Sequence, residues 1–135
     1  MKMCVFCKIV KGEIPSYKIY ENKNVLAFLD ISQVTPGHTL VIPKKHYENI
    51  FELDEKISGE LFKATNEIAK KLQKKLQINA LNIINNNGPL AGQEVFHYHI
   101  HLLPRYENDN VKFNYPKHEF DKQKLEEIHK KILGN

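Results

Sequence analysis

Three histidines, His97, His99 and His101, alternate with apolar or aromatic residues in the second half of the chain. Successive side chains of a β-strand point to opposite faces of the sheet. We therefore predict a strand over residues 96–103 that presents the histidines on one face. The residues between them would share the other face and pack against the helices.

Histidine suits attack on phosphorus, because its reference pKa of about 6.5 leaves much of it neutral and nucleophilic near pH 7. Attack by His99 would give a phosphohistidine that water then hydrolyses. Phosphoryl transfer depends on positioning and charge stabilisation, so donors to the phosphate oxygens are also needed. His101 and His38 are side-chain candidates, and peptide N–H groups of residues 92–94 are candidates for an anion-binding nest. No Gly-x-x-x-x-Gly-Lys-Ser/Thr motif is present, which excludes a P-loop NTPase.

A three-histidine metal site is the first alternative. A strand rises about 3.3 Å per residue, so the backbones of His97 and His101 would lie roughly 13 Å apart. Zinc holds nitrogen ligands at about 2.0–2.1 Å, which favours one or two ligands from this strand over three. The second alternative is a solvated sheet face. Strict alternation beside a glycine-bearing loop disfavours it.

Cys4 and Cys7 are the only two cysteines, and their Cys-x-x-Cys spacing suggests metal or redox chemistry rather than a disulfide. A closed tetrahedral zinc site needs two further ligands, for which His46 and His97 are candidates. Such a structural site would leave the other histidines of the run for chemistry. The spacing alone is equally compatible with two buried thiols that bind no metal.

The apolar pattern predicts an α+β fold, because short strands close in sequence favour antiparallel pairing. Asp54 is a candidate N-cap for a long helix whose apolar stripe ends at Leu76. The other expected elements are a short helix over residues 5–10, a hairpin of strands 17–21 and 25–30, buried strands 39–42 and 80–84, and a last helix over 121–133.

The 135 residues fit a single domain, and 41% hydrophobic with 27% charged residues is ordinary for a globular protein. No run approaches the roughly 18 apolar residues of a membrane span, and no signal peptide precedes the first cysteine. We therefore expect a cytoplasmic protein. The net charge of +4 permits phosphate binding, but we expect no nucleic-acid partner, since the basic run over residues 70–75 reads as a solvated helix face.

Residues 91–103 resemble the signature of the histidine-triad (HIT) superfamily, in which His-x-His-x-His precedes two apolar residues. Supporting segments at 4–10, 27–32 and 37–46 follow in the family's order, so the likeness covers about residues 4–105. Within the superfamily the chain resembles the Hint branch in its bacterial-type form. Residues 106–135 diverge. The tail shapes the partner subunit's site in this family, which leaves substrate choice open.

The resemblance implies a five-stranded antiparallel sheet with two main helices, joined across a homodimer into one sheet. It implies a hydrolase that binds a purine nucleoside monophosphate and acts as a nucleoside 5′-phosphoramidate hydrolase through a nucleotidylated His99. Two alternatives stay open. One is a dinucleoside polyphosphate hydrolase with the same nucleophile. The other is a non-catalytic, zinc-stabilised nucleotide-binding or adaptor protein.

Residue by residue, the resemblance makes His99 the nucleophile and His101 and His38 the phosphate-side histidines, and it assigns Asp30 to the ribose hydroxyls. The base pocket would comprise Val5, Phe6, Ile9, Phe28 and Ile31; the phosphate-side wall Asn86, Gly92, Gln93 and Val95; and a structural Zn²⁺ site Cys4, Cys7, His46 and His97. Phe28 and Ile31 could equally be core residues, and Asp30 and Asn86 turn residues.

Glu94 departs from the pattern, because eukaryotic Hint proteins carry serine there, near the leaving group. An ionised carboxylate facing phosphate would repel it. Glu94 could instead donate a proton or bind a cationic amine leaving group. The departure concerns the leaving-group preference and leaves the nucleophile unaffected.

Overall fold

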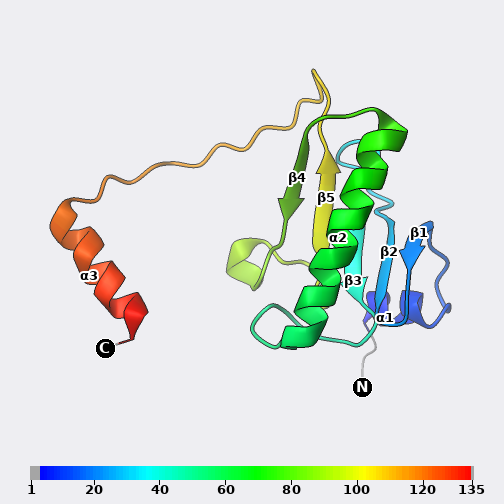
Figure 1. The fold of residues 1–135 in the computed structure, drawn as a ribbon, viewed down its shortest axis with the longest axis horizontal. Coiled ribbons are helices and arrows are strands. Elements are labelled where there is room, and N and C mark those ends of the chain that lie inside the picture. Colours follow the sequence, from blue (N-terminus) through cyan, green and yellow to red (C-terminus); the bar gives the residue numbers. More distant parts are fainter. Residues whose placement is uncertain (1–3, 135) are drawn as a thin grey trace.

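Five antiparallel strands form one sheet in the computed structural model, which describes residues 4–134 (Figure 1). The order across the sheet is β1-β2-β3-β5-β4. The strands are β1 (Lys18–Glu21), β2 (Val25–Leu29), β3 (Thr39–Pro43), β4 (Leu81–Ile84) and β5 (Ile100–Pro104). The α+β class and the five-stranded antiparallel sheet predicted from the sequence are confirmed.

The helices are α1 (Val5–Val10), α2 (Glu55–Leu76) and α3 (Lys122–Leu133), with a 3-10 turn η1 (Pro89–Ala91). The predicted cap of α2 is present, because the Asp54 side chain accepts the N–H of Ile57. Asp121 caps α3 in the same way, and Gly134 ends it in the left-handed conformation. None of the helices described here is long and apolar enough to cross a membrane.

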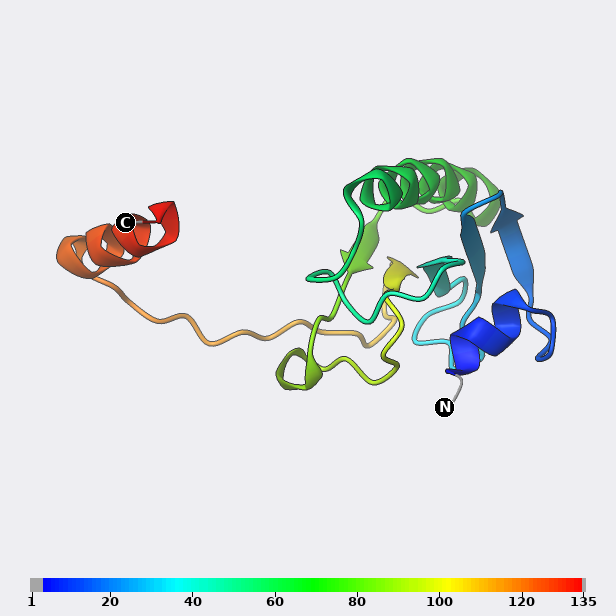
Figure 2. The same cartoon turned by 90° about the horizontal axis from the view of Figure 1, so that it is seen from below.

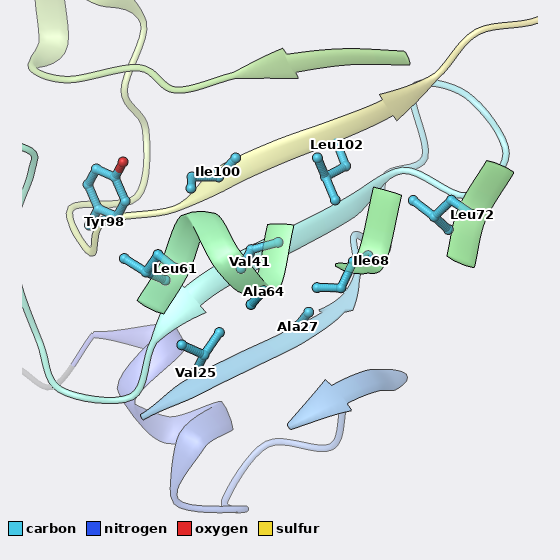
Figure 3. Packing of buried hydrophobic residues seen from close by; sticks show 10 residues of the cluster. All are labelled: Val25, Ala27, Val41, Leu61, Ala64, Ile68, Leu72, Tyr98, Ile100 and Leu102. Carbon is cyan, nitrogen blue, oxygen red and sulfur yellow. The ribbon is translucent and has the colours of Figure 1, made fainter. Parts of the chain in front are cut away.

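α2 covers one face of the sheet, and α1 lies against the other (Figure 2). Under α2, alternate residues of β2, β3 and β5 pack on the apolar stripe of the helix (Figure 3). The residues of this core are Val25, Ala27, Val41, Leu61, Ala64, Ile68, Leu72, Tyr98, Ile100 and Leu102. The intervening strand residues Leu26, Phe28, Leu40 and Ile42 pack on Phe6 and Ile9 of α1. Because His101 pairs with Leu40, it lies on this second face of the sheet.

The predicted strand over residues 96–103 is wrong in its first half, because β5 begins only at Ile100. Val41 pairs with Ile100, so continued pairing would set Tyr98 opposite Pro43, which has no N–H to donate. The N–H of Tyr98 donates instead to the carbonyl of Tyr47 at 2.6 Å. Tyr98 still reaches the core under α2, as predicted, whereas Phe96 is 40% exposed.

The tail beyond Arg105 leaves the sheet and carries α3 away from it in both views (Figures 1 and 2). Residues 110–121 form neither helix nor strand, and every described residue of α3 is exposed. The sheet and α2 therefore hold the cleft residues described below without help from α3.

Gly37 is the glycine at which a side chain would be least tolerated. Its φ is +94°, and a Cβ there would lie 2.5 Å from Cδ1 of Leu76 and 3.1 Å from Cγ of Pro104. We expect Gly37→Ala to lower the free energy of unfolding by about 1–3 kcal/mol, through backbone strain and overpacking. Urea denaturation measures this change.

Gly59→Ala is the matched control, because Gly59 lies within α2 and a Cβ there would meet nothing within 4 Å. It should stabilise the protein by about 0.5–1 kcal/mol, since alanine favours a helix over glycine. Equal effects of the two substitutions would contradict the close packing at Gly37.

Candidate active site

His99 is 6% exposed, and its ring is oriented by one hydrogen bond. Its Nδ1 lies 2.8 Å from the carbonyl oxygen of His97. A carbonyl oxygen only accepts, so Nδ1 carries the hydrogen and Nε2 keeps its lone pair. The Nδ2 of Asn85 donates to the carbonyl of His99 itself at 2.8 Å, which anchors the backbone at this residue. The hydrogen bonds around His99 thus define which of its nitrogens, Nε2, keeps a free lone pair.

His101 and His38 form a second histidine unit beside His99. The peptide N–H of Val34 donates to Nδ1 of His38 at 3.3 Å, so Nε2 of His38 carries the hydrogen. This Nε2 lies 2.9 Å from Nδ1 of His101, which must accept. The hydrogen of His101 is therefore on its Nε2. With the ring centroids of His99 and His101 4.8 Å apart, a free lone pair lies beside an N–H donor.

Burial lowers the pKa of all three of these histidines. For His101 the pKa falls to about 4, because neighbouring His99 and His38 add to the effect of burial. For His38 burial outweighs the opposing influence of Asp30, whose Oδ2 is 3.6 Å from its Nε2. All three rings are therefore neutral at pH 7, as a nucleophile and its neutral donor require.

A cleft of about 420 Å³ opens in front of His99 and His101. Its walls are Phe6, Asp30, Ser32, Leu40, Asn86, Gly92, Glu94, Val95, His99 and His101. Eight of these are residues that the sequence predicts for the site. Leu40 and Ser32 are not among them. Leu40 could have been predicted from the alternation along β3, which places it opposite His101 on the same face of the sheet.

Several other predicted contacts do not line this cleft. Ile9 and Phe28 are buried in the core under α1, and His38 lies behind His101. Ile31 is 88% exposed and borders a separate hollow beside Tyr17. Val5, the first residue of α1, is 43% exposed.

Gln93 is buried and connects the segments around the cleft. Its Oε1 accepts the N–H of Gly88 at 2.7 Å, and its Nε2 donates to the carbonyls of Glu48 and Val95 at 2.7 and 3.1 Å. The peptide N–H groups of Gly92 and Gln93 donate within the turn, to Pro89 and Gly88. The N–H groups of Gly92 and Gln93 are therefore not available to the predicted nest at residues 92–94, whereas those of Glu94 and Val95 have no acceptor among residues 4–134.

Asp30 follows β2 and faces the cleft with a half-buried carboxylate. Its Oδ1 accepts the N–H of Ser32 at 2.8 Å, which fixes the carboxylate plane. With His38 and His101 it forms a cluster whose ligand atoms lie within 4.8 Å. The histidine nitrogens that face one another are already hydrogen-bonded, so the cluster fits a polar network better than a metal site.

Cys4, Cys7, His46 and His97 do converge as a metal site would require. The two sulfur atoms lie 3.3–3.6 Å from the Nδ1 atoms of the histidines, and the two Nδ1 atoms are 3.2 Å apart. Tetrahedral zinc with sulfur at about 2.3 Å and nitrogen at about 2.0–2.1 Å places ligand atoms roughly 3.3–3.8 Å apart. The four side chains therefore fit Zn²⁺.

The hydrogen bonding of His97 leaves its Nδ1 able to bind a cation. Nε2 of His97 lies 2.8 Å from the carbonyl of Pro43, so it carries the hydrogen and leaves the Nδ1 lone pair free. Burial, together with Cys4, raises the pKa of the Cys7 thiol to about 11. A nearby cation is what would hold this sulfur as a thiolate.

Comparison with known proteins agrees with the fold. A family model described as the HIT domain matches residues 11–108. The adenosine 5′-monophosphoramidase of Saccharomyces cerevisiae is 42% identical over 132 residues, which are 97% of this chain and 81% of that protein. A HIT family structure from Bacillus subtilis has a TM-score of 0.93 at 45% identity, covering 98% of this chain and 96% of that one.

A zinc-bound histidine triad family protein from Mycobacterium smegmatis matches with a TM-score of 0.77 at 38% identity, covering 84% and 82% of the two chains. The matched family model spans well over half of the sequence. The chain belongs to the HIT family, as the spacing of its histidines predicted.

The lowered histidine pKa values predict how stability depends on pH. Below about pH 6.5 an unfolded histidine takes up a proton, whereas buried His101 resists protonation until about pH 4. The unfolded state then binds more protons, so the free energy of unfolding should fall as the pH falls through this window.

Urea denaturation at several pH values between about 7 and 4 measures the slope. His101→Gln should show a shallower slope than the wild type in the same buffers, whereas His118→Gln, at an exposed position in the tail, should not. If the free energy of unfolding of His101→Gln depended on pH as steeply as that of the wild type, the assignment of this pH dependence to His101 would be contradicted.

Proposed function

We propose that this protein is a hydrolase of nucleoside 5′-phosphoramidates. The observation that carries the proposal is the hydrogen bond from Nδ1 of His99 to the carbonyl of His97. This bond leaves the lone pair of Nε2 free on a ring that lines the cleft. The similarity to an adenosine 5′-monophosphoramidase supports the choice of reaction.

In the proposed mechanism, Nε2 of His99 attacks phosphorus as the P–N bond breaks, and the departing amine nitrogen takes up a proton from solvent at the open cleft. Water then attacks the phosphorus of the nucleotidylated His99 as the P–Nε2 bond breaks, which releases the nucleoside monophosphate, restores the His99 lone pair and returns the proton to solvent. The Nε2–H of His101 is placed to donate to a phosphoryl oxygen, with the N–H groups of Glu94 and Val95 as further donors. His38 positions His101 and holds its tautomer.

The cleft walls suggest how a purine nucleotide would lie. Phe6, Leu40 and Val95 offer apolar surface for the base, and Phe6 also contacts the His99 ring edge-on, with centroids 5.2 Å apart. The free oxygen of Asp30 can accept from the ribose hydroxyls. Asn86 lies on the phosphate side.

We also propose a structural Zn²⁺ held by the two cysteines, His46 and His97. When bound, it would fix α1 to the segment before β5 and supply folding energy. Two cysteines kept as free ligands suit a reducing compartment, which supports a cytoplasmic location. By resemblance to the family, we propose a homodimer joined through the sheets.

The nucleophile assignment is tested by His99→Ala. Hydrolysis of a fluorogenic adenosine or guanosine phosphoramidate should fall by at least about 10³-fold, because the covalent step is removed. Binding of AMP or GMP should persist, and unfolding curves should show that the variant is folded.

His99→Gln retains the bulk of the side chain and should be equally inactive, whereas His118→Ala should match the wild type. Retention of most activity in His99→Ala would exclude His99 as the nucleophile. Nucleotide binding without any turnover by the wild type would favour the adaptor alternative, and turnover of diadenosine polyphosphates alone would favour the polyphosphate hydrolase.

Cys4→Ser tests the structural metal. We expect the zinc content per chain and the unfolding midpoint to fall clearly, because a closed site contributes folding energy. Activity should fall less, since His97 keeps its hydrogen bond to the carbonyl of Pro43. Loss of activity at unchanged stability and zinc content would show that the role is not structural.

A further inference from the structure

The charges on the cleft walls are all of one sign. The described lining residues include two carboxylates, Asp30 and Glu94, but no lysine or arginine. His101, the ring that can donate to a phosphate oxygen, accepts at Nδ1 from Nε2 of His38 at 2.9 Å and is therefore a neutral imidazole. A phosphate in this cleft is therefore held by neutral donors, and each further negative charge on the substrate meets no compensating cation.

The two carboxylates differ in what already occupies them. Asp30 accepts a peptide N–H from Ser32 and faces His38. Glu94 is exposed, and its carboxylate makes no hydrogen bond or ion pair with any residue between 4 and 134. Glu94 is thus the residue of the cleft wall whose carboxylate can pair with a charged group of a substrate.

The backbone around Glu94 is held in place although its side chain is free. Gln93, the preceding residue, is bonded through its side chain to the carbonyls of Glu48 and Val95. The bond to Val95 spans Glu94 within the loop, and the bond to Glu48 ties this loop to the segment after β3. The carboxylate therefore starts from a fixed point on the wall that also carries Gly92 and Val95.

We propose that Glu94 is a specificity-determining residue that selects leaving groups by charge. This inference rests on the proposed phosphoramidate hydrolysis. Amines that carry an additional positive charge are favoured, because the Glu94 carboxylate attracts them. Leaving groups that carry negative charge, including the phosphate chain of a dinucleoside polyphosphate, are disfavoured by both carboxylates. An exposed pair contributes modestly, so the preference amounts to about 2–5-fold per unit charge.

The test uses three phosphoramidates of one nucleoside whose leaving amines have the same length and end in an ammonium, a hydroxyl or a carboxylate group. The ratios of kcat/KM among them are measured for the wild type and for Glu94→Gln and Glu94→Lys. The wild type should rank the ammonium substrate first and the carboxylate substrate last. Glu94→Gln should bring the ratios close to one, and Glu94→Lys should invert them.

Glu13→Gln is the matched control, because it removes the same charge at an exposed position outside the cleft, and it should keep the wild-type ratios. Relative kcat/KM for diadenosine triphosphate should rise in Glu94→Lys. Unchanged ratios in Glu94→Gln would overturn the role of Glu94 while leaving the hydrolase intact. Absence of turnover with all three phosphoramidates in the folded wild type would instead overturn the proposed function.

Discussion

The site depends most on the way His97 is held. Its fully buried ring is bonded at Nε2 to the carbonyl of Pro43, at the end of β3, and its Nδ1 faces the two cysteines. Its own carbonyl accepts from Nδ1 of His99. One residue therefore connects the sheet, the cysteine–histidine cluster and His99. The positions of the hydrogens on two imidazoles follow from carbonyl groups that can only accept.

The alternation of β5 divides the work between the two faces of the sheet. Ile100 and Leu102 complete the core under α2, whereas His101 lies on the opposite face with Leu40. α1 covers part of that second face and contributes Phe6 to the cleft. Burial by these neighbours lowers the histidine pKa values, so the packing that stabilises the fold also keeps the reactive nitrogens unprotonated.

Most of the strands and helices could be predicted from the sequence, because local structure leaves a local pattern. Strands show apolar residues at every second position, helices show an apolar stripe, and capping residues mark helix ends. The cap Asp54, the extent of α2 and the last helix ending at Leu133 were predicted correctly. The start of β5 was not, because it depends on the neighbouring strand, where continued pairing would set Tyr98 opposite Pro43, which has no N–H. Likewise, the sequence could not show that the Gln93 side chain would form hydrogen bonds within its own loop, or that Ile31 would be exposed to solvent. Both depend on how segments distant in the sequence pack together.

The contrast between the whole molecule and its cleft has a kinetic consequence. The chain carries a net charge of +4, while the charged groups on the walls of the cleft are carboxylates. Long-range attraction acts on every anionic nucleotide during diffusion and weakens as the Debye length shortens. Under the role proposed for Glu94, discrimination arises after contact, inside the cleft. Encounter rate and selectivity are then carried by different charges, and because the Glu94 side chain is exposed, higher ionic strength weakens both.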